Sequence, residues 1–221
     1  MRSYAQYCPI AKTAEVIGDR WSILILRDML VGTDRFNELA RGLPGLSRNL
    51  LASRLRHLEA SGLVSRSDGR YVLTEAGLDL RPLVFGMAEW GAKWAFPDPE
   101  PDDLDPDLLV WWMHGQMDQS LAPETRAVVQ IEFLDCNSHY WLVIEPTDVS
   151  VCLTDPGFEV DVFLRSTRRT LYLVWMGRID FGTTLSSGEI ELTGKSDLVR
   201  AFPTWLRMSP VSPAVRAAAR R

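Results

Sequence analysis

Hydrophobic residues in the first part of the chain recur at three- and four-residue spacing, which is typical of amphipathic helices. A first helix is expected between Cys8 and Gly18, because Pro9 suits a first helical position. A second follows Asp19, a residue type that caps helices, and is apolar enough to lie in a core. A third covers residues 36–43 and ends at a sharp Leu-Pro-Gly-Leu break. The pattern predicts a small helical domain.

The next helix has two sharply different faces. It begins at Ser47, a good N-cap, and its apolar face is formed by leucines at 51, 55 and 58. The opposite face carries polar and small residues, namely Arg48, Asn49, Ala52, Ser53 and Arg56. A DNA recognition helix needs an apolar face toward its own domain. Its other face needs short polar side chains or arginine guanidinium groups, which can donate hydrogen bonds to base edges. This helix is therefore the candidate reader of base edges.

A short hairpin follows the candidate recognition helix. Residues 63–74 alternate around Asp68-Gly69, a pair favoured in two-residue type I′ turns, and Arg66 and Arg70 flank that turn. Helix, turn, recognition helix and basic hairpin, in this order, predict a winged helix. On pattern alone the leucines could simply be core and the arginines a solvated face, so both interpretations stay open.

Residues 74–94 form a further helical stretch that is richer in large apolar side chains than one face of a small domain can cover. The excess comes from seven residues: Leu78, Leu80, Leu83, Val84, Met87, Trp90 and Trp94. Uncovered apolar surface of this kind indicates a partner. If the partner is a second copy, the twofold axis of the homodimer would present two recognition helices about one DNA turn apart, which suits a pseudo-palindromic operator in double-stranded DNA.

The second half of the chain has a different pattern. Residues 97–107 combine prolines and aspartates without apolar periodicity, which predicts an acidic linker. Short β-rich runs follow at 128–133, 140–144, 149–153 and 160–164, with turn residues between them that are typical of an antiparallel meander. Helices are expected around 168–176 and 197–206. We therefore predict an α+β protein with domains at 1–96 and 108–221.

Charge and cysteine content refine this picture. The net charge of −5 conceals an asymmetry: residues 1–96 carry 13 Lys and Arg against 10 acidic residues, and residues 97–221 carry 11 against 19. Only the first segment has the charge sign of a phosphate-binding surface. The three cysteines are unevenly spaced and indicate neither disulfides nor a zinc site. With no apolar run of transmembrane length and no secretion signal, the expected location is cytoplasmic.

Residues 7–94 contain a set of specific motifs: Cys8-Pro9, Gly18-x-x-Trp21, Leu26-Arg27-Asp28, Arg35-Phe36-x-Glu38-Leu39, residues 43–47 (Leu-Pro-Gly-Leu-Ser), and a Leu-x-x-Arg-Leu-x-x-Leu-Glu-x-x-Gly-Leu-Val run over 51–64. With these motifs the segment resembles the HxlR family of bacterial regulators. The resemblance implies a dimeric winged-helix repressor or activator. The family wing is usually longer and contains prolines, so the short turn here puts minor-groove contact by the wing in doubt.

Several residues are candidates for DNA contact or signal sensing. Bases would be read by Arg48, Asn49 and Ser53 after the Ser47 cap, and phosphates would be bound mainly by Arg54, Arg56, Arg66 and Arg70. Cys8 lies at a helix start, where backbone donors favour a thiolate, and the resembled family includes members that sense electrophiles through this position. Cys8 is thus a candidate redox sensor, although simple packing is the commoner role of such a cysteine.

Between residues 140 and 210 the chain contains the runs 140–146, 149–164, 171–181, 185–192 and 198–206. Through these runs it resembles, more loosely, domains of the sterol carrier protein fold. That family binds apolar or acyl-chain molecules between a five-stranded sheet and its helices, which implies an effector sensor or a dimer-stabilising module. The aromatic residues in the matching runs, Trp141, Trp175, Phe181 and Trp205, are the candidate walls of a ligand pocket, and simple core packing is the open alternative.

The leading hypothesis is a dimeric, sequence-specific DNA-binding regulator, expected to be a repressor, that an apolar small molecule modulates. A lipid or acyl-group carrier that uses the winged helix for protein contacts is the alternative. A small hydrolase or transferase finds no support, because the sequence has neither a nucleophile elbow nor a phosphate loop. No catalytic residue, metal site or cofactor is predicted.

Overall fold

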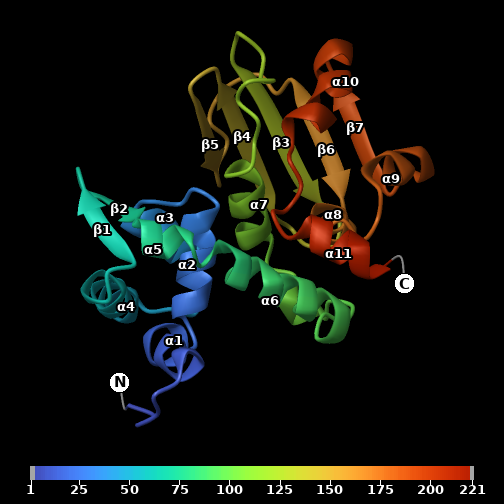
Figure 1. Ribbon diagram of the computed structural model, residues 1–221. Coiled ribbons are helices and arrows are strands. Elements are labelled where there is room, and N and C mark those ends of the chain that lie inside the picture. Colours follow the sequence, from blue (N-terminus) through green and yellow to red (C-terminus); the bar gives the residue numbers. More distant parts are fainter. Residues whose placement is uncertain (1–2, 220–221) are drawn as a thin grey trace. The chain divides into compact units, whose positions relative to one another are not determined.

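The computed structural model describes residues 3–219, and the chain divides into two compact units, Met1–Ala88 and Glu89–Arg221 (Figure 1). The division falls inside helix α6 (Arg81–Trp94). Helices accompany a two-stranded and a five-stranded sheet, which confirms the predicted α+β class. Among the described residues, no helix combines the length and the apolar character that a membrane crossing requires.

The first unit contains the predicted helices and hairpin in the predicted order. Its elements are α1 (Pro9–Ile17), α2 (Ser22–Leu30), α3 (Phe36–Gly42), α4 (Arg48–Ala60), β1 (Val64–Ser67), β2 (Arg70–Leu73) and α5 (Glu75–Leu78). Ile25 and Leu26 of α2 pack in one core with Leu39 of α3 and the leucines of α4. The core contains the leucines at 51, 55 and 58 that the helical spacing of α4 predicts.

Two local signals act as the sequence predicts. The Asp19 carboxylate accepts hydrogen bonds from the N–H groups of Trp21 and Ser22, so Asp19 caps the start of α2 although the helix begins only at Ser22. Asp68 and Gly69 both have positive φ, 50° and 75°, as a type I′ turn between β1 and β2 requires.

The second unit is a five-stranded sheet with helices on one face. Its elements are η1 (Pro101–Asp103), α7 (Pro106–His114), β3 (Ala127–Phe133), β4 (His139–Glu145), β5 (Asp148–Cys152), β6 (Val162–Ser166), α8 (Arg168–Trp175), α9 (Phe181–Ser187), β7 (Ile190–Gly194), α10 (Ser196–Trp205) and α11 (Ser212–Ala219). Side chains of α7, α8 and α10 share one core with the sheet, and Figure 1 shows α7 and α10 in front of the strands.

The strand order is β5-β4-β3-β6-β7, and it corrects the predicted meander. Strands β3, β4 and β5 pair in antiparallel succession, as the turn signals predict. Strand β6 instead pairs parallel to β3, on the side away from β4 and β5. The segment between β5 and β6 therefore passes across β4 and β3, whereas in a meander a tight turn joins each strand to its neighbour in the sheet. Strand β7, which was not predicted, closes the far edge.

The acidic segment predicted as a linker is folded onto the second unit. It contains η1 and the first turn of α7, where the Asp105 carboxylate accepts the N–H groups of residues 107 and 108. Arg178 forms an ion pair with Asp98 at 2.5 Å, donates to the carbonyl oxygens of Phe96 and Pro97, and stacks on the Phe96 ring. Arg169 also pairs with Asp98, at 3.1 Å. Residues 96–98 are therefore anchored on the second unit.

A buried carboxylate joins three strands of this unit. Asp161, which precedes β6, accepts the Val128 N–H of β3 at 2.8 Å and pairs with the Lys195 ammonium, after β7, at 2.6 Å. Its own backbone bonds to the same two residues, with Asp161 N–H donating to Val128 and Lys195 N–H donating to Asp161. Because Asp161 is only 7% exposed, water cannot easily replace the carboxylate as the acceptor of the Val128 N–H.

We predict that Asp161→Ala lowers the free energy of unfolding of the second unit by about 1–3 kcal/mol, because it leaves a buried N–H unpaired. Urea titration followed by tryptophan fluorescence measures the change. Glu159→Ala is the matched control, since Glu159 lies 3.6 Å from the same ammonium but its side chain is 81% exposed, and such pairs contribute little. Equal losses in the two variants would contradict the role given to Asp161.

Candidate nucleic-acid interface

Packing fixes which face of α4 meets solvent. Leu51, Leu55 and Leu58 are fully buried, at 0% exposure, whereas Arg48 and Asn49 at the start of the helix are exposed. The exposed set predicted for DNA contact also includes Ser53 and Arg56, and the structure places both on the solvent side. The helix thus presents its N-terminal polar residues outward from an apolar core.

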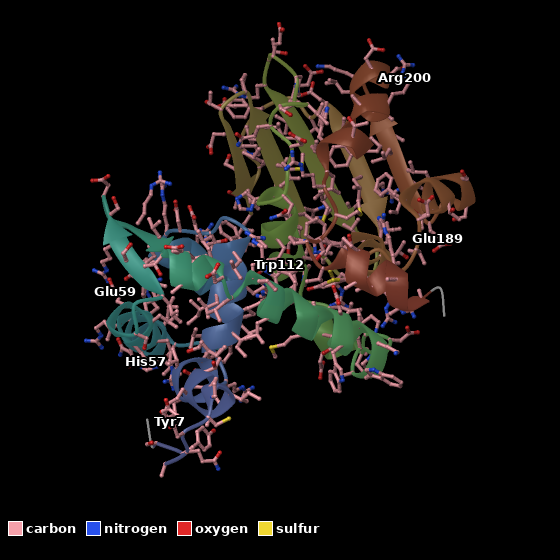
Figure 2. The ribbon with its side chains drawn as sticks, in the orientation of Figure 1. Tyr7, His57, Glu59, Trp112, Glu189 and Arg200 are labelled. Carbon is pink, nitrogen blue, oxygen red and sulfur yellow. The ribbon has the colours of Figure 1, made fainter. Side chains whose placement is uncertain are left out.

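Ser47 sets the start of this helix. Its hydroxyl oxygen accepts the Leu50 N–H at 3.3 Å, and its backbone is extended, as at a typical N-cap. The first turn of α4 consequently begins at Arg48, which fixes the direction in which Arg48 and Asn49 leave the backbone. At the other end, the His57 ring lies 3.0 Å from the Val16 carbonyl oxygen, so α4 is tied to α1 (Figure 2).

Arg48 is held by the first turn of α3. Its Nη2 donates to the Asn37 side-chain oxygen at 2.5 Å, and its guanidinium lies 5.0 Å from the centre of the Phe36 ring. Neither neighbour was predicted from the sequence, because they lie 11 and 12 positions away on another helix. Phe36 belongs to the helix predicted over residues 36–43 and to the Arg-Phe-x-Glu-Leu motif, and neither pattern indicates a contact with Arg48.

Arg54 behaves differently from the other arginines of α4. Its Nε lies 3.3 Å from the Asp19 carboxylate, so its charge is directed toward the start of α2. Burial alone raises the pKa of Asp19, but hydrogen bonds from the Ser22 hydroxyl and from the N–H groups of Trp21 and Ser22, together with Arg54, lower it below its usual value. The phosphate contact expected of Arg54 stays a prediction.

Both wing arginines have acidic neighbours. Arg66 pairs with Glu59 at 3.3 Å and stacks 4.7 Å above the Tyr71 ring, and Figure 2 shows Glu59 at the end of α4 nearer the hairpin. Arg70 pairs with Asp34 at 2.7 Å, and this hydrogen bond raises the pKa of Arg70. The Tyr71 N–H also donates to the Asp34 carbonyl oxygen, which fixes the hairpin to the segment before α3.

Cys8 occupies the N-cap position of α1 and is a half-buried, free thiol. Its side chain makes no capping hydrogen bond. Lys12, the cation nearest in sequence, forms an ion pair with Glu15 at 2.9 Å, which reduces the positive charge available to a Cys8 thiolate. The redox role of Cys8 stays a prediction.

The four aromatic residues proposed as pocket walls are not all brought together. Trp175 and Trp205 are buried in the core between sheet and helices, and Phe181 packs against that core. Trp141 lies on the opposite face of the sheet, because it alternates along β4 with Tyr140 and Leu142, which face the core. Only three of the four can therefore line one site.

The first unit has the arrangement that defines a winged helix-turn-helix protein, a class of DNA-binding transcription regulators. A family described as HxlR-like helix-turn-helix matches residues 16–99. The HTH-type transcriptional regulator YybR of Bacillus subtilis is 40% identical over 91 residues, which are 38% of this chain and 73% of YybR. The chain belongs to the HxlR-like family.

Solved structures are similar over different parts of the chain. The redox regulator HypR, in its oxidised form, is 40% identical over 38% of this chain and 94% of HypR, with a TM-score of 0.36. The sec-alkylsulfatase Pisa1 from a Pseudomonas species is 18% identical over 90% of this chain and 29% of Pisa1, with a TM-score of 0.42. Both scores are too low to support conclusions about this chain, and the sterol carrier resemblance stays a prediction.

Proposed function

We propose that this chain is a homodimeric repressor that reads a pseudo-palindromic operator with the N-terminal part of α4 in the major groove. The observation that carries the proposal is the complete burial of Leu51, Leu55 and Leu58 of α4, while Arg48 and Asn49 on the same helix are exposed. Arg48 offers a fork suited to guanine, and Asn49 can pair with adenine. Ser53, one and a half turns further along, lies on the same solvent side.

Phosphate contacts fall to arginines around this helix. Arg56 continues the exposed face, and Arg66 and Arg70 extend it onto the hairpin. The ion pair of Arg70 with Asp34 does not prevent this role, because both side chains are substantially exposed and exposed pairs contribute little energy. A DNA phosphate can therefore compete with the Asp34 carboxylate for the guanidinium.

We predict that Arg48→Ala or Asn49→Ala weakens binding to the operator by about 1–3 kcal/mol while non-specific binding is little changed. Selection from random DNA gives the operator, and fluorescence anisotropy on operator and scrambled duplexes gives both affinities at fixed salt. Arg56→Ala is the control, because loss of a phosphate contact weakens binding to both duplexes alike. Uniform loss in all three variants would overturn the base-reading assignment.

In a reporter strain carrying the operator, Arg48→Ala should raise transcription if the protein is a repressor.

The homodimer is proposed from an apolar stripe along α6. Leu83, Met87, Trp90 and Trp94 are spaced so that they share one helix face, and their exposed fractions run from 45% to 66%. Large apolar groups at such exposure favour a protein partner, and a second copy with the same stripe is self-complementary about a twofold axis. A dimer also supplies the second recognition helix that a palindromic operator requires.

We predict that Met87→Glu converts the dimer to a monomer, because it places a charge in the proposed apolar interface. Sedimentation velocity measures the change, and operator affinity should fall with it. Glu89→Gln is the control, since Glu89 is exposed on the same helix but lies off the stripe. A dimer that survives Met87→Glu at micromolar concentration would place the interface elsewhere.

Signals that release the operator are proposed at two places. An apolar small molecule would bind among Trp175, Phe181 and Trp205, which gather on the helix-covered side of the sheet. Oxidation or alkylation of Cys8 would act from the start of α1, which His57 connects to α4 through the Val16 carbonyl. The two routes are independent and can be tested separately.

We predict that a fatty acid or acyl-coenzyme A quenches tryptophan fluorescence and lowers operator affinity by about 1–3 kcal/mol, the usual range of allosteric coupling. Quenching without a change in operator affinity would favour the alternative, a lipid or acyl-group carrier.

We predict that oxidation by diamide releases the operator from the wild-type protein and not from Cys8→Ser. Release from both proteins would exclude sensing through Cys8.

A further inference from the structure

The contacts of Arg48 with α3 have a use beyond packing, if α4 reads DNA as proposed above. We propose that Asn37 is a positioning residue for base recognition, which aims the Arg48 guanidinium and so sharpens the preference of the protein for one base pair. The proposal rests on the geometry around Arg48 and on the proposed function, since it assigns a role to a residue that is not itself taken to contact bases.

An arginine fork recognises guanine only when its plane and direction are right, and a free arginine side chain samples many rotamers. Arg48 is the first residue of α4 and is exposed, so the core does not restrain it. Two contacts do. The hydrogen bond to Asn37, 2.5 Å long, fixes one edge of the guanidinium, and the Phe36 ring face, 5.0 Å away, fixes its plane.

These contacts leave the recognition chemistry intact. Guanidinium has five N–H donors, one of which is directed to the Asn37 oxygen, so enough remain for a forked contact to guanine. The amide oxygen of Asn37 is neutral, and it therefore orients Arg48 without reducing the attraction between Arg48 and DNA. An aspartate at this position would accept the same hydrogen bond but would repel phosphates.

The support for Arg48 is rigid, although Asn37 itself is exposed. Phe36 and Asn37 are the first two residues of α3, and Phe36 packs against the core that also contains Leu39, Leu51 and Leu55. The helix-turn-helix core therefore sets the distance between Asn37 and the start of α4. A long side chain that is ordered before it meets DNA loses less freedom on binding.

The test compares base preferences of the full-length protein and its variants, using selection from random duplex DNA followed by anisotropy on the selected site and on single base-pair changes. We expect Arg48→Ala to flatten the preference at one base pair in each half-site. Asn37→Ala should flatten the preference at that same base pair by about three- to tenfold, the range that ordering one long side chain supplies. The Asn37→Ala, Arg48→Ala double variant should be no worse than Arg48→Ala alone.

Asn37→Asp separates aiming from charge. It keeps the acceptor, so it should retain the base preference while affinity falls on every sequence, more so at low salt. Phe36→Leu keeps the apolar packing but removes the ring face, and it should flatten the same base pair. Thermal unfolding of Asn37→Ala should match the wild type, because an exposed side chain contributes little to the core.

Two outcomes would overturn the proposal while leaving the proposed function standing. Uniform weakening of Asn37→Ala on all DNA would make Asn37 a phosphate contact, and an unchanged base preference would make its hydrogen bond to Arg48 irrelevant to recognition. If Arg48→Ala itself leaves every base preference unchanged, the base-reading assignment of the proposed function fails first, and the role of Asn37 falls with it.

Discussion

Burial of the leucine face of α4 is the constraint on which the interface depends. With Leu51, Leu55 and Leu58 in the core, the helix cannot rotate about its axis without exposing them, and each would cost about 1.5–3 kcal/mol to expose. Arg48 and Asn49 therefore face solvent because the leucines on the opposite side of α4 are packed in the core. The Ser47 cap sets a second property of α4, because it fixes the residue at which the helix begins. Rotation and starting point together define what a DNA groove would meet.

Positive charge on this unit is held in place by neighbours from other elements. Arg54 is directed to Asp19, Arg66 to Glu59 and Tyr71, and Arg70 to Asp34. The acidic partners lie at least seven positions away along the chain, so these ion pairs connect the segments before α2 and α3 with α4 and the hairpin. The overall charge excess of the segment is small, yet Arg54, Arg66 and Arg70 each have a defined acidic neighbour. Local arrangement therefore matters more for this surface than net charge does.

Local features were predictable from the sequence and non-local ones were not. Periodicity and caps gave the helices of the first unit, and Asp68-Gly69 gave the turn of the hairpin, because these signals act within a few residues. The parallel pairing of β6 with β3 was missed, since nothing within 160–164 specifies which strand it joins. The alternation of side chains along β4 could have shown that Trp141 lies on the opposite face of the sheet from the core. The four aromatic residues were grouped by the sterol carrier resemblance, which does not say on which face of the sheet each side chain lies. The contact between Asn37 and Arg48 depends on how α3 and α4 cross, and local sequence patterns do not predict that crossing.

Residues 96–98 have the composition of a flexible linker, yet side chains of the second unit hold them in place. Arg178 contacts the Asp98 carboxylate, the carbonyl oxygens of Phe96 and Pro97, and the Phe96 ring, and Arg169 forms a second ion pair with Asp98. Residue 96 follows the last residue of α6 by only two positions. The Arg178 contacts therefore hold the chain within two residues of the end of α6. A shift of the turn that follows α8 would reach α6 through a single intervening residue, Ala95.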